Sequence, residues 1–225
     1  MITVSIVLPV NNEEKGIESV IKKLIGSFKK VNTTFEIVCV ENGSTDKSFQ
    51  KLKELAAKHK EVRVCQSDKG WGNAVKEGVE RIKGEYCCYM VSDNQVDPQC
   101  ALNLLKKITK SDLDMIKVKR VSRENLIRLL NSRIYNLICK VFFGVGNDIN
   151  ATPKILKSSL IKSLDLKSEN IAIDLELVLK LKKRNLRWID IPIYSKKREW
   201  GESTTNIKTA IEMLKYIIRF RFRKN

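Results

Sequence analysis

The residues with the clearest chemistry are Asp93 and Gln95, which follow an apolar run at 86–91 and precede a proline-led helix start at Pro98. In an extended segment, side chains two residues apart project to the same side. A carboxylate and an amide oxygen presented together at a strand end can hold a hard divalent cation that also binds a diphosphate. The segment therefore predicts a site for Mg²⁺ or Mn²⁺ at Asp93 and Gln95.

Apolar runs and turn signals up to residue 120 predict strands that alternate with helices. The expected strands are 3–8, 35–40, 62–65, 86–91 and 113–118, and the expected helices are 14–29, 45–58, 71–82 and 98–109. Strands that alternate with helices of this length form parallel βαβ units. We therefore expect an α/β fold with a mostly parallel central sheet flanked by helices.

The pattern is looser beyond residue 120. Helices are expected at 123–143, 171–183 and 204–220, with a strand at 187–191 and an irregular stretch through Asp148 and Pro153. No internal repeat or linker divides the chain. We expect one domain over residues 1–203, with residues 204–225 forming a basic amphipathic C-terminal helix that is part of the same domain and faces a membrane.

Polar, turn-forming residues follow the first four expected strands, at 9–13, 41–46, 67–73 and 92–95. Any one of these stretches is ordinary chemistry for a turn between a strand and a helix. Ligands of open parallel sheets bind beyond the carboxyl ends of the strands, however. Four polar turns at one edge of one sheet therefore predict a binding site there.

The composition is that of a folded and strongly basic protein. Apolar residues make up 43% of the 225 residues and there are 4 prolines, which argues against disorder. The formal net charge of +17 suits anionic partners such as nucleic acid, a membrane surface or phosphorylated substrates, and a lysine-rich solvated surface explains it equally well. A nucleic-acid-binding module is disfavoured, because no recognition motif is present and the basic residues are not interleaved with stacking aromatics.

The cysteines and the single histidine give no sign of metal or imidazole chemistry. The six cysteines form no C-x-x-C pair and lie mostly within apolar runs, so we expect buried, reduced thiols of a cytosolic protein. His59 lies at an expected helix end beside lysines. No signal peptide is evident and no apolar run approaches about 18 residues, so we expect no membrane span.

The segments 7–14, 40–46, 69–74 and 93–98 resemble, in order and spacing, the nucleotide-binding signatures of family-2 inverting glycosyltransferases with the GT-A fold. The most similar branch is that of the polyprenyl-phosphate sugar synthases, which includes dolichol-phosphate mannose synthase, and the resemblance covers roughly residues 3–205. It implies a nucleotide-sugar donor held by the following residues: Pro9, Asn11, Glu13, Glu41, Asn42, Lys69, Gly70, Asn73 and Ser92. Gly70 and its neighbour Gly72 would permit close backbone contact with the nucleotide.

The chain departs from the family pattern at the metal site. The resemblance makes Asp93 and Gln95 the metal-binding residues, but Val91 stands where the family usually has a first aspartate. Asn11 replaces a frequent aromatic residue, and Glu41-Asn42 replaces a frequent pair of aspartates. Mg²⁺ often keeps one protein carboxylate plus substrate phosphates, so activity is compatible with this loss. A non-catalytic nucleotide-binding relative is the alternative.

The second half of the chain concerns the acceptor. Asp148 resembles a family aspartate, although the small, glycine and aromatic residues that usually follow are missing. Asp174 and Glu176 either face the site or lie on a solvent-facing helix start stabilised by the helix dipole. The R-x-x-G-x-S loop at 198–203 resembles one that, in the lipid-phosphate branch, binds phosphate through its arginine, here Arg198, with Ser203 beside it.

The acceptor decides whether a general base is needed. A sugar hydroxyl must lose its proton to a placed carboxylate, for which Asp174 and Glu176 are the candidates. A phosphate monoester has a second pKa of about 6, so it is already a nucleophilic dianion at neutral pH and needs only cations to hold it. The basic residues Arg120, Arg123, Arg133 and Arg198 fit the second case. We therefore expect sugar transfer, with inversion, to a polyprenyl phosphate, and keep a sugar hydroxyl as the alternative.

The last expected helix has an apolar stripe bordered by cations and ends in alternating Arg and Phe, at 219–223. Such a helix can lie on an anionic bilayer with its aromatic side chains in the interface, or its stripe can pack on the sheet. We expect a cytoplasmic protein that is peripheral on the inner face of a membrane. A partner protein with a membrane span is a further hypothesis.

Overall fold

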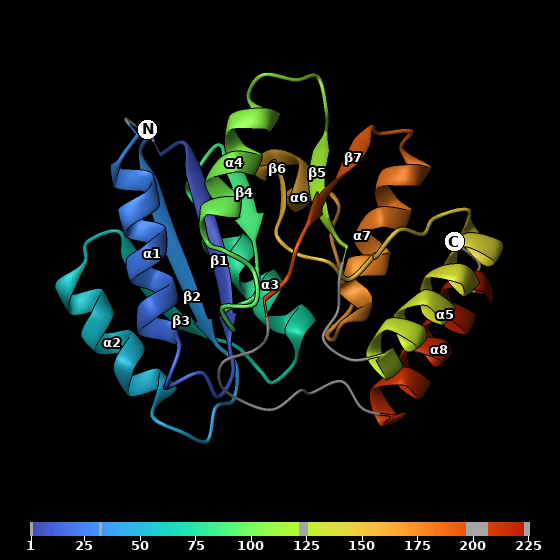
Figure 1. The fold of residues 1–225 in the computed structure, drawn as a ribbon, viewed down its shortest axis with the longest axis horizontal. Helices are drawn as coiled ribbons and strands as arrows, with labels where there is room; N and C mark the ends of the chain where they lie inside the picture. Colours follow the sequence, from blue (N-terminus) through green and yellow to red (C-terminus); the bar gives the residue numbers. More distant parts are fainter. Residues whose placement is uncertain (1, 32, 122–125, 197–206, 223–225) are drawn as a thin grey trace.

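The computed structural model describes residues 2–31, 33–121, 126–196 and 207–222. These residues form one seven-stranded sheet with helices on both sides (Figure 1). The strands are β1 (Val4–Val10), β2 (Phe35–Glu41), β3 (Val62–Gln66), β4 (Tyr86–Tyr89), β5 (Met115–Arg120), β6 (Lys154–Lys157) and β7 (Trp188–Ile193). The helices are α1 (Ile17–Lys29), α2 (Ser48–Lys58), α3 (Trp71–Arg81), α4 (Gln99–Ile108), α5 (Leu126–Phe143), α6 (Ser158–Ser163), α7 (Ala172–Lys183) and α8 (Ile207–Phe222).

The sheet has the order β3-β2-β1-β4-β6-β5-β7, and β6 runs antiparallel to both of its neighbours. The other paired strands are parallel, which confirms the predicted mostly parallel α/β fold. The predicted irregular stretch through Asp148 and Pro153 contains no helix or strand, but the sequence analysis assigned no element to the residues that follow it, which form β6 and α6. β6 has four residues, follows Pro153, and begins and ends with lysine, so it shows neither a continuous nor an alternating apolar pattern.

Alternate residues of the central strands pack on opposite faces of the sheet, as the two-residue period of a strand requires. Ile6 and Leu8 of β1 join one buried cluster with α1, α2 and α4, whereas Val7 joins another with α3, α5, α6, α7 and α8. Both faces are therefore covered, which explains why the first strands read as continuous apolar runs.

The C-terminal helix α8 lies beside α5 at the β7 end of the sheet (Figure 1). Ile217 of α8 is buried in the second cluster, but the next residue, Ile218, is 58% exposed. This helix therefore packs against the domain with one side and leaves apolar surface on another. Among the residues described, no helix combines the length and hydropathy needed to cross a bilayer.

The expectation of reduced thiols is confirmed, since all six cysteines are free. Four of them are buried and two, Cys65 and Cys100, are partly buried. Burial raises the pKa of Cys87 to about 12 and that of Cys100 to about 11, so both stay protonated at neutral pH.

Candidate active site

The polar turns that follow β1, β2 and β4 are joined to one another by hydrogen bonds. Asn11 Nδ2 donates to the carbonyl oxygen of Asn42 at 3.1 Å, and Ser92 Oγ donates to that of Pro9 at 2.8 Å. The backbone N–H of Glu13 donates to Ser48 Oγ at 2.8 Å. Because β1, β2, β3 and β4 are parallel neighbours, their carboxyl ends share one edge, and these bonds make that edge a single continuous surface.

Glu41 ends β2 as a buried acid that organises the turn after it. Its carboxylate accepts hydrogen bonds from the backbone N–H of Ser44 at 2.5 Å and from Gln66 Nε2 at 3.0 Å. Burial alone would raise the pKa of Glu41, but the hydrogen bonds from Gln66 and Ser44 outweigh it and lower the pKa. Glu41 is therefore an ionised acceptor at neutral pH, suited to receiving hydrogen bonds from a base or a ribose.

Residues 69–73, which we call the donor loop, lie against residues 167–170, which we call the facing loop. Gly70 has φ +136°, and a Cβ there would lie 2.4 Å from the carbonyl oxygen of Glu169. A Cβ on Gly72 would lie 2.3 Å from that of Ser168, and the N–H of Asn73 donates to Glu169 at 3.0 Å. Our interpretation that these glycines make room for the nucleotide is incomplete, because they make room for the facing loop.

The donor loop is also tied to β2. Asn42 Nδ2 donates to the carbonyl oxygen of Gly70 at 3.2 Å, and the Cβ of Lys69 packs close to Gly43. Asn73 Nδ2 closes the loop by donating to the carbonyl oxygen of Lys69 at 3.2 Å. The predicted nucleotide-binding residues of the first half therefore belong to one connected group.

The candidate metal loop is not the extended segment that the sequence analysis assumed. β4 ends at Tyr89, Asn94 has a left-handed φ of 58°, and the N–H of Gln95 donates to Asp93 Oδ1 at 3.1 Å. Asp93 and Gln95 are therefore brought together by a turn, and the argument from strand alternation was wrong. Lys196, after β7, donates its N–H to the carbonyl oxygen of Gln95 at 2.8 Å and so joins this turn to the second half of the chain.

The residues at this turn fit a divalent ion that takes further ligands from its substrate. Among the described residues, no group of three His, Cys, Asp or Glu side chains is placed to hold a metal. Asp93 offers one carboxylate beside amide groups, and Mg²⁺ commonly combines one protein carboxylate with water and phosphate oxygens. This donor set favours an ion bound together with a diphosphate over a cage made by the protein alone.

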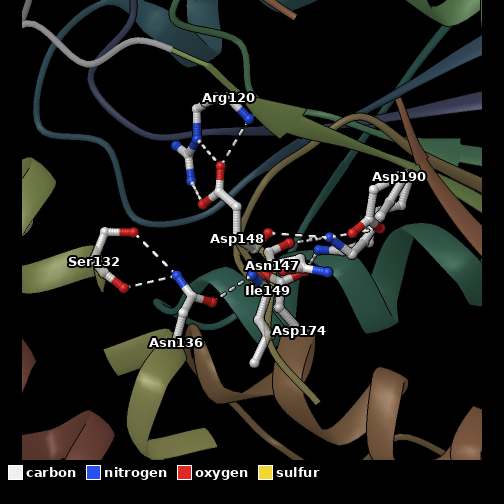
Figure 2. Close-up of polar contacts among 10 residues, drawn as sticks. Arg120, Ser132, Asn136, Asn147, Asp148, Ile149, Asp174 and Asp190 are labelled. Atoms are coloured by element: carbon white, nitrogen blue, oxygen red, sulfur yellow. Dashed lines mark hydrogen bonds and ion pairs between the residues drawn. The ribbon is translucent and has the colours of Figure 1, made fainter. Parts of the chain in front are cut away.

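In the second half of the chain, where the acceptor residues were predicted, a polar turn is organised around Asp148. Its carboxylate binds the guanidinium of Arg120 at two points (Figure 2). Lys117 Nζ donates to the carbonyl oxygen of Asn147 at 2.6 Å. Asn147 and Asp148 both have left-handed φ values, of 69° and 55°. Asn136 of α5 accepts a hydrogen bond from the N–H of Ile149 at 3.0 Å (Figure 2). The turn at 147–149 is thus held by Arg120 and Lys117 of β5 and by Asn136 of α5.

The structure describes two of the four arginines that were predicted to bind phosphate. Arg120 is engaged by Asp148, and Arg133 is exposed on α5. Arg123, Arg198 and Ser203 lie outside the described residues.

Asp174 and Glu176 are buried, so the interpretation of a solvent-facing helix start was wrong. Asp174 is 1% exposed and forms an ion pair with Lys154, while its oxygens also accept hydrogen bonds from Tyr89 OH at 2.8 Å and Trp71 Nε1 at 3.2 Å. Glu176 is 4% exposed and accepts from the backbone N–H of Ser168 at 2.8 Å. Sequence reasoning gave no role to Lys154, because its burial is explained only by Asp174, a partner that is distant in the sequence.

The chain resembles known glycosyltransferases in sequence. The family model for glycosyl transferase family 2 matches residues 5–150. A dolichol-phosphate mannosyltransferase of Pyrococcus furiosus is 25% identical over 96% of this chain and 63% of its own length. An undecaprenyl-phosphate 4-deoxy-4-formamido-L-arabinose transferase of Edwardsiella ictaluri is 27% identical over 94% of this chain and 65% of its own. The chain therefore spans less than two thirds of the length of these relatives.

Solved structures share the fold. Glucosyl-3-phosphoglycerate synthase from Mycobacterium tuberculosis, in complex with Mn²⁺, uridine diphosphate and phosphoglyceric acid, superposes with a TM-score of 0.72 at 18% identity. The match covers 96% of this chain and 76% of that one. At this identity the likeness concerns the GT-A fold alone.

Proposed function

Because the family model matches residues 5–150, the chain belongs to glycosyl transferase family 2, and we propose that it transfers a sugar from a nucleotide-diphosphate donor to a polyprenyl phosphate. The observation that carries the proposal is the continuous polar edge formed by the turns after β1, β2 and β4, with the donor loop beside it. Relatives that act on dolichol phosphate and undecaprenyl phosphate support this acceptor class.

The donor would lie along this edge. The ionised carboxylate of Glu41 and the amides of Asn11 and Asn42 are suited to the hydrogen-bonding groups of a nucleoside, and Asp93 and Gln95 to the metal side of the diphosphate. A bound Mg²⁺ or Mn²⁺ would supply charge neutralisation for the departing diphosphate. A phosphate oxygen of the acceptor would form the new bond to the anomeric carbon as the bond to the diphosphate breaks on the opposite side, which inverts that carbon.

A phosphate acceptor is also supported by the state of the two candidate bases. Asp174 and Glu176 are buried and engaged by hydrogen-bond donors, which leaves neither suited to take a proton from a sugar hydroxyl. A phosphate dianion needs no base. We propose that Arg133, Arg123, Arg198 and Ser203 hold it, and that Arg120 contributes by fixing the turn at Asp148.

A membrane location is supported by the exposed side of α5. Leu130, Ile134, Leu137 and Val141 follow one another at helical spacing and are each at least 48% exposed. The helix contains no acidic residue, and two of its cations, Arg133 and Lys140, are exposed. An apolar stripe flanked by cations suits an anionic bilayer, so we propose that α5 and α8 place the protein on the cytoplasmic face of a membrane. A partner with a membrane span would strengthen this attachment.

A thermal-shift panel with uridine and guanosine diphosphates and their sugar conjugates, each with Mn²⁺, Mg²⁺ or EDTA, tests the donor site. We expect one nucleotide to raise the Tm in a metal-dependent manner, because ligands that bind the native state stabilise it. Asp93→Asn should lose the metal-dependent part of the shift, whereas Asp97→Asn, an exposed acid in the same segment, should keep it. Transfer of labelled sugar to polyprenyl phosphate then tests the acceptor, and transfer to a sugar alone would overturn it.

A further inference from the structure

A row of polar residues, buried except for the partly buried Asp190, crosses the sheet from β4 to β7. In register, Tyr89 of β4 pairs with Lys154 of β6, Lys154 with Lys117 of β5, and Lys117 with Asp190 of β7. Both lysines are fully buried. Each has its own counter-ion, since Lys117 Nζ lies 3.0 Å from Asp190 Oδ1 and Lys154 pairs with Asp174 of α7. Two like charges side by side in a core are costly, so their acidic partners are needed for the fold.

Asp174 extends this row to the donor loop. One of its oxygens accepts hydrogen bonds from Lys154 and Tyr89, and the other accepts one from the indole N–H of Trp71 at 3.2 Å. Trp71 is the first residue of α3 and the centre of the donor loop, and its ring lies 6.4 Å from that of Tyr89. A hydrogen bond to a buried, ion-paired carboxylate fixes where α3 begins.

Glu176, one helical half-turn further on, fixes the facing loop. Its carboxylate accepts hydrogen bonds from the backbone N–H of Lys167 at 2.9 Å and of Ser168 at 2.8 Å, and Lys180 Nζ lies 2.8 Å away. The facing loop is in turn the surface on which Gly70 and Gly72 rest without room for a Cβ. Any movement of the facing loop therefore displaces the donor loop.

We propose that Asp174 and Glu176 are positioning residues for the donor, which hold the donor loop in shape from behind, Asp174 through Trp71 and Glu176 through the facing loop. The inference rests on the proposed function, because it assigns the donor loop to the nucleotide sugar. Neither carboxylate exchanges a proton with the reactants in this account. Their loss should therefore weaken donor binding and leave the chemical step at saturating donor nearly unchanged.

Trp71→Phe is the sharpest test, because it keeps an aromatic ring and removes the N–H that Asp174 binds. Trp188→Phe, a partly buried tryptophan of β7, is its matched control. With the full chain, calorimetric titration of the nucleotide that binds the wild type should show about three- to tenfold weaker binding for Trp71→Phe and no change for Trp188→Phe. Glu176→Gln, which replaces one of the two side-chain oxygens that accept from the backbone N–H groups of Lys167 and Ser168, should behave like Trp71→Phe.

Initial-rate measurements complete the test. We expect Trp71→Phe and Glu176→Gln to raise the KM for the donor, to keep kcat within about twofold, and to leave the shape of the pH–rate profile unchanged. Because Asp174→Asn alone strands the charge of Lys154, the double variant Asp174→Asn/Lys154→Met is used, with the same expectation. Unchanged donor affinity with a large loss of kcat and of the low-pH limb would overturn the inference in favour of a base. Wild-type donor affinity and kinetics in all three variants would overturn it as well, whereas a wild type that binds no nucleotide would overturn the proposed function instead.

Discussion

Arg120 and Asp148 form a two-point ion pair, in which Nε lies 2.9 Å from Oδ2 and Nη2 lies 2.7 Å from Oδ1. The backbone N–H of Arg120 donates to the same Oδ2 at 2.9 Å. Asp148 lies in a left-handed turn that few residues adopt without support. The last residue of β5 therefore supports the shape of the turn at 147–149.

Replacement of Arg120 by lysine should impair use of the acceptor selectively. A lysine keeps the charge but cannot make the two-point contact, and losing one charged hydrogen bond costs about 1.5 kcal/mol, which is roughly tenfold. We expect the KM for polyprenyl phosphate to rise about tenfold, with donor affinity unchanged. Arg63→Lys is the control, because Arg63, in the edge strand β3, makes only a one-point ion pair, at 2.8 Å from Glu36, and its other hydrogen bond goes to the carbonyl oxygen of Arg81 at 2.9 Å. An equal effect of the two substitutions on acceptor KM would contradict the prediction.

Introduction of an acid at the departure from the family pattern should strengthen metal binding. Val91→Asp places a second carboxylate two residues before Asp93, close to the turn that brings Asp93 and Gln95 together. We expect Mn²⁺ to bind about tenfold more tightly in the presence of nucleoside diphosphate, since carboxylate number sets the affinity of such sites. Metal titration monitored by calorimetry measures it.

The matched control for this substitution is Val91→Asn, which changes polarity and size without adding charge. Equal Mn²⁺ affinity in Val91→Asp and in the wild type would mean that position 91 does not contribute to the ion's surroundings.

The sequence was most informative for strands that are buried on both faces and consist mostly of apolar residues. The strands around Ile6, Val7 and Leu8 are covered on both faces, so a continuous apolar run, polar turns and amphipathic helices are enough to predict the layers and the edge that carries the site. β6 could not be predicted in this way. Its first residue is Lys154, and a lysine at a fully buried strand position is explained only by Asp174, which lies twenty residues away in the chain.

Contacts between residues far apart in the sequence also explain why some predictions about the site were wrong. Asp174 and Glu176 are acidic residues near the start of a helix, where side chains usually meet solvent. Only the packing of α7 against the donor and facing loops shows that they point inward. The turn at Asp93 and Gln95 was treated as a continuation of a strand because residues 86–91 are apolar throughout. The strand stops at Tyr89, and the left-handed Asn94 turns the chain, a feature that depends on a side chain tolerant of positive φ.

Glu176 should make the free energy of unfolding depend on pH in the acid range. Burial alone would raise its pKa, but the hydrogen bonds from Lys180, Ser168 and Lys167 outweigh it and lower the pKa below its ordinary 4.5. A group with a lowered pKa in the folded state contributes stability above 4.5, and that contribution is lost as the pH falls through the folded pKa. Glu176→Gln should therefore be about 1–3 kcal/mol less stable than the wild type at pH 7, with a smaller difference below pH 4.5.

Urea unfolding of both proteins at several pH values measures this difference. Glu54→Gln, which removes an exposed carboxylate bound to Gln50 on α2, is the control and should differ little from the wild type. A Glu176→Gln deficit of the same size at every pH would show that the carboxylate contributes through shape and not through its charge.

The apolar side of α5 should govern membrane attachment. Leu137 is 61% exposed in the middle of the stripe, and a glutamate there would place a charge in the interface and repel anionic lipid. We expect Leu137→Glu to reduce flotation with phosphatidylserine-containing liposomes by roughly tenfold, while nucleotide binding stays at the wild-type level. Ala57→Glu makes the same change of charge at an exposed position of α2, on the opposite side of the molecule (Figure 1), and should float like the wild type. Equal loss in the two variants would mean that net charge alone draws the protein to the membrane, and that the stripe has another use.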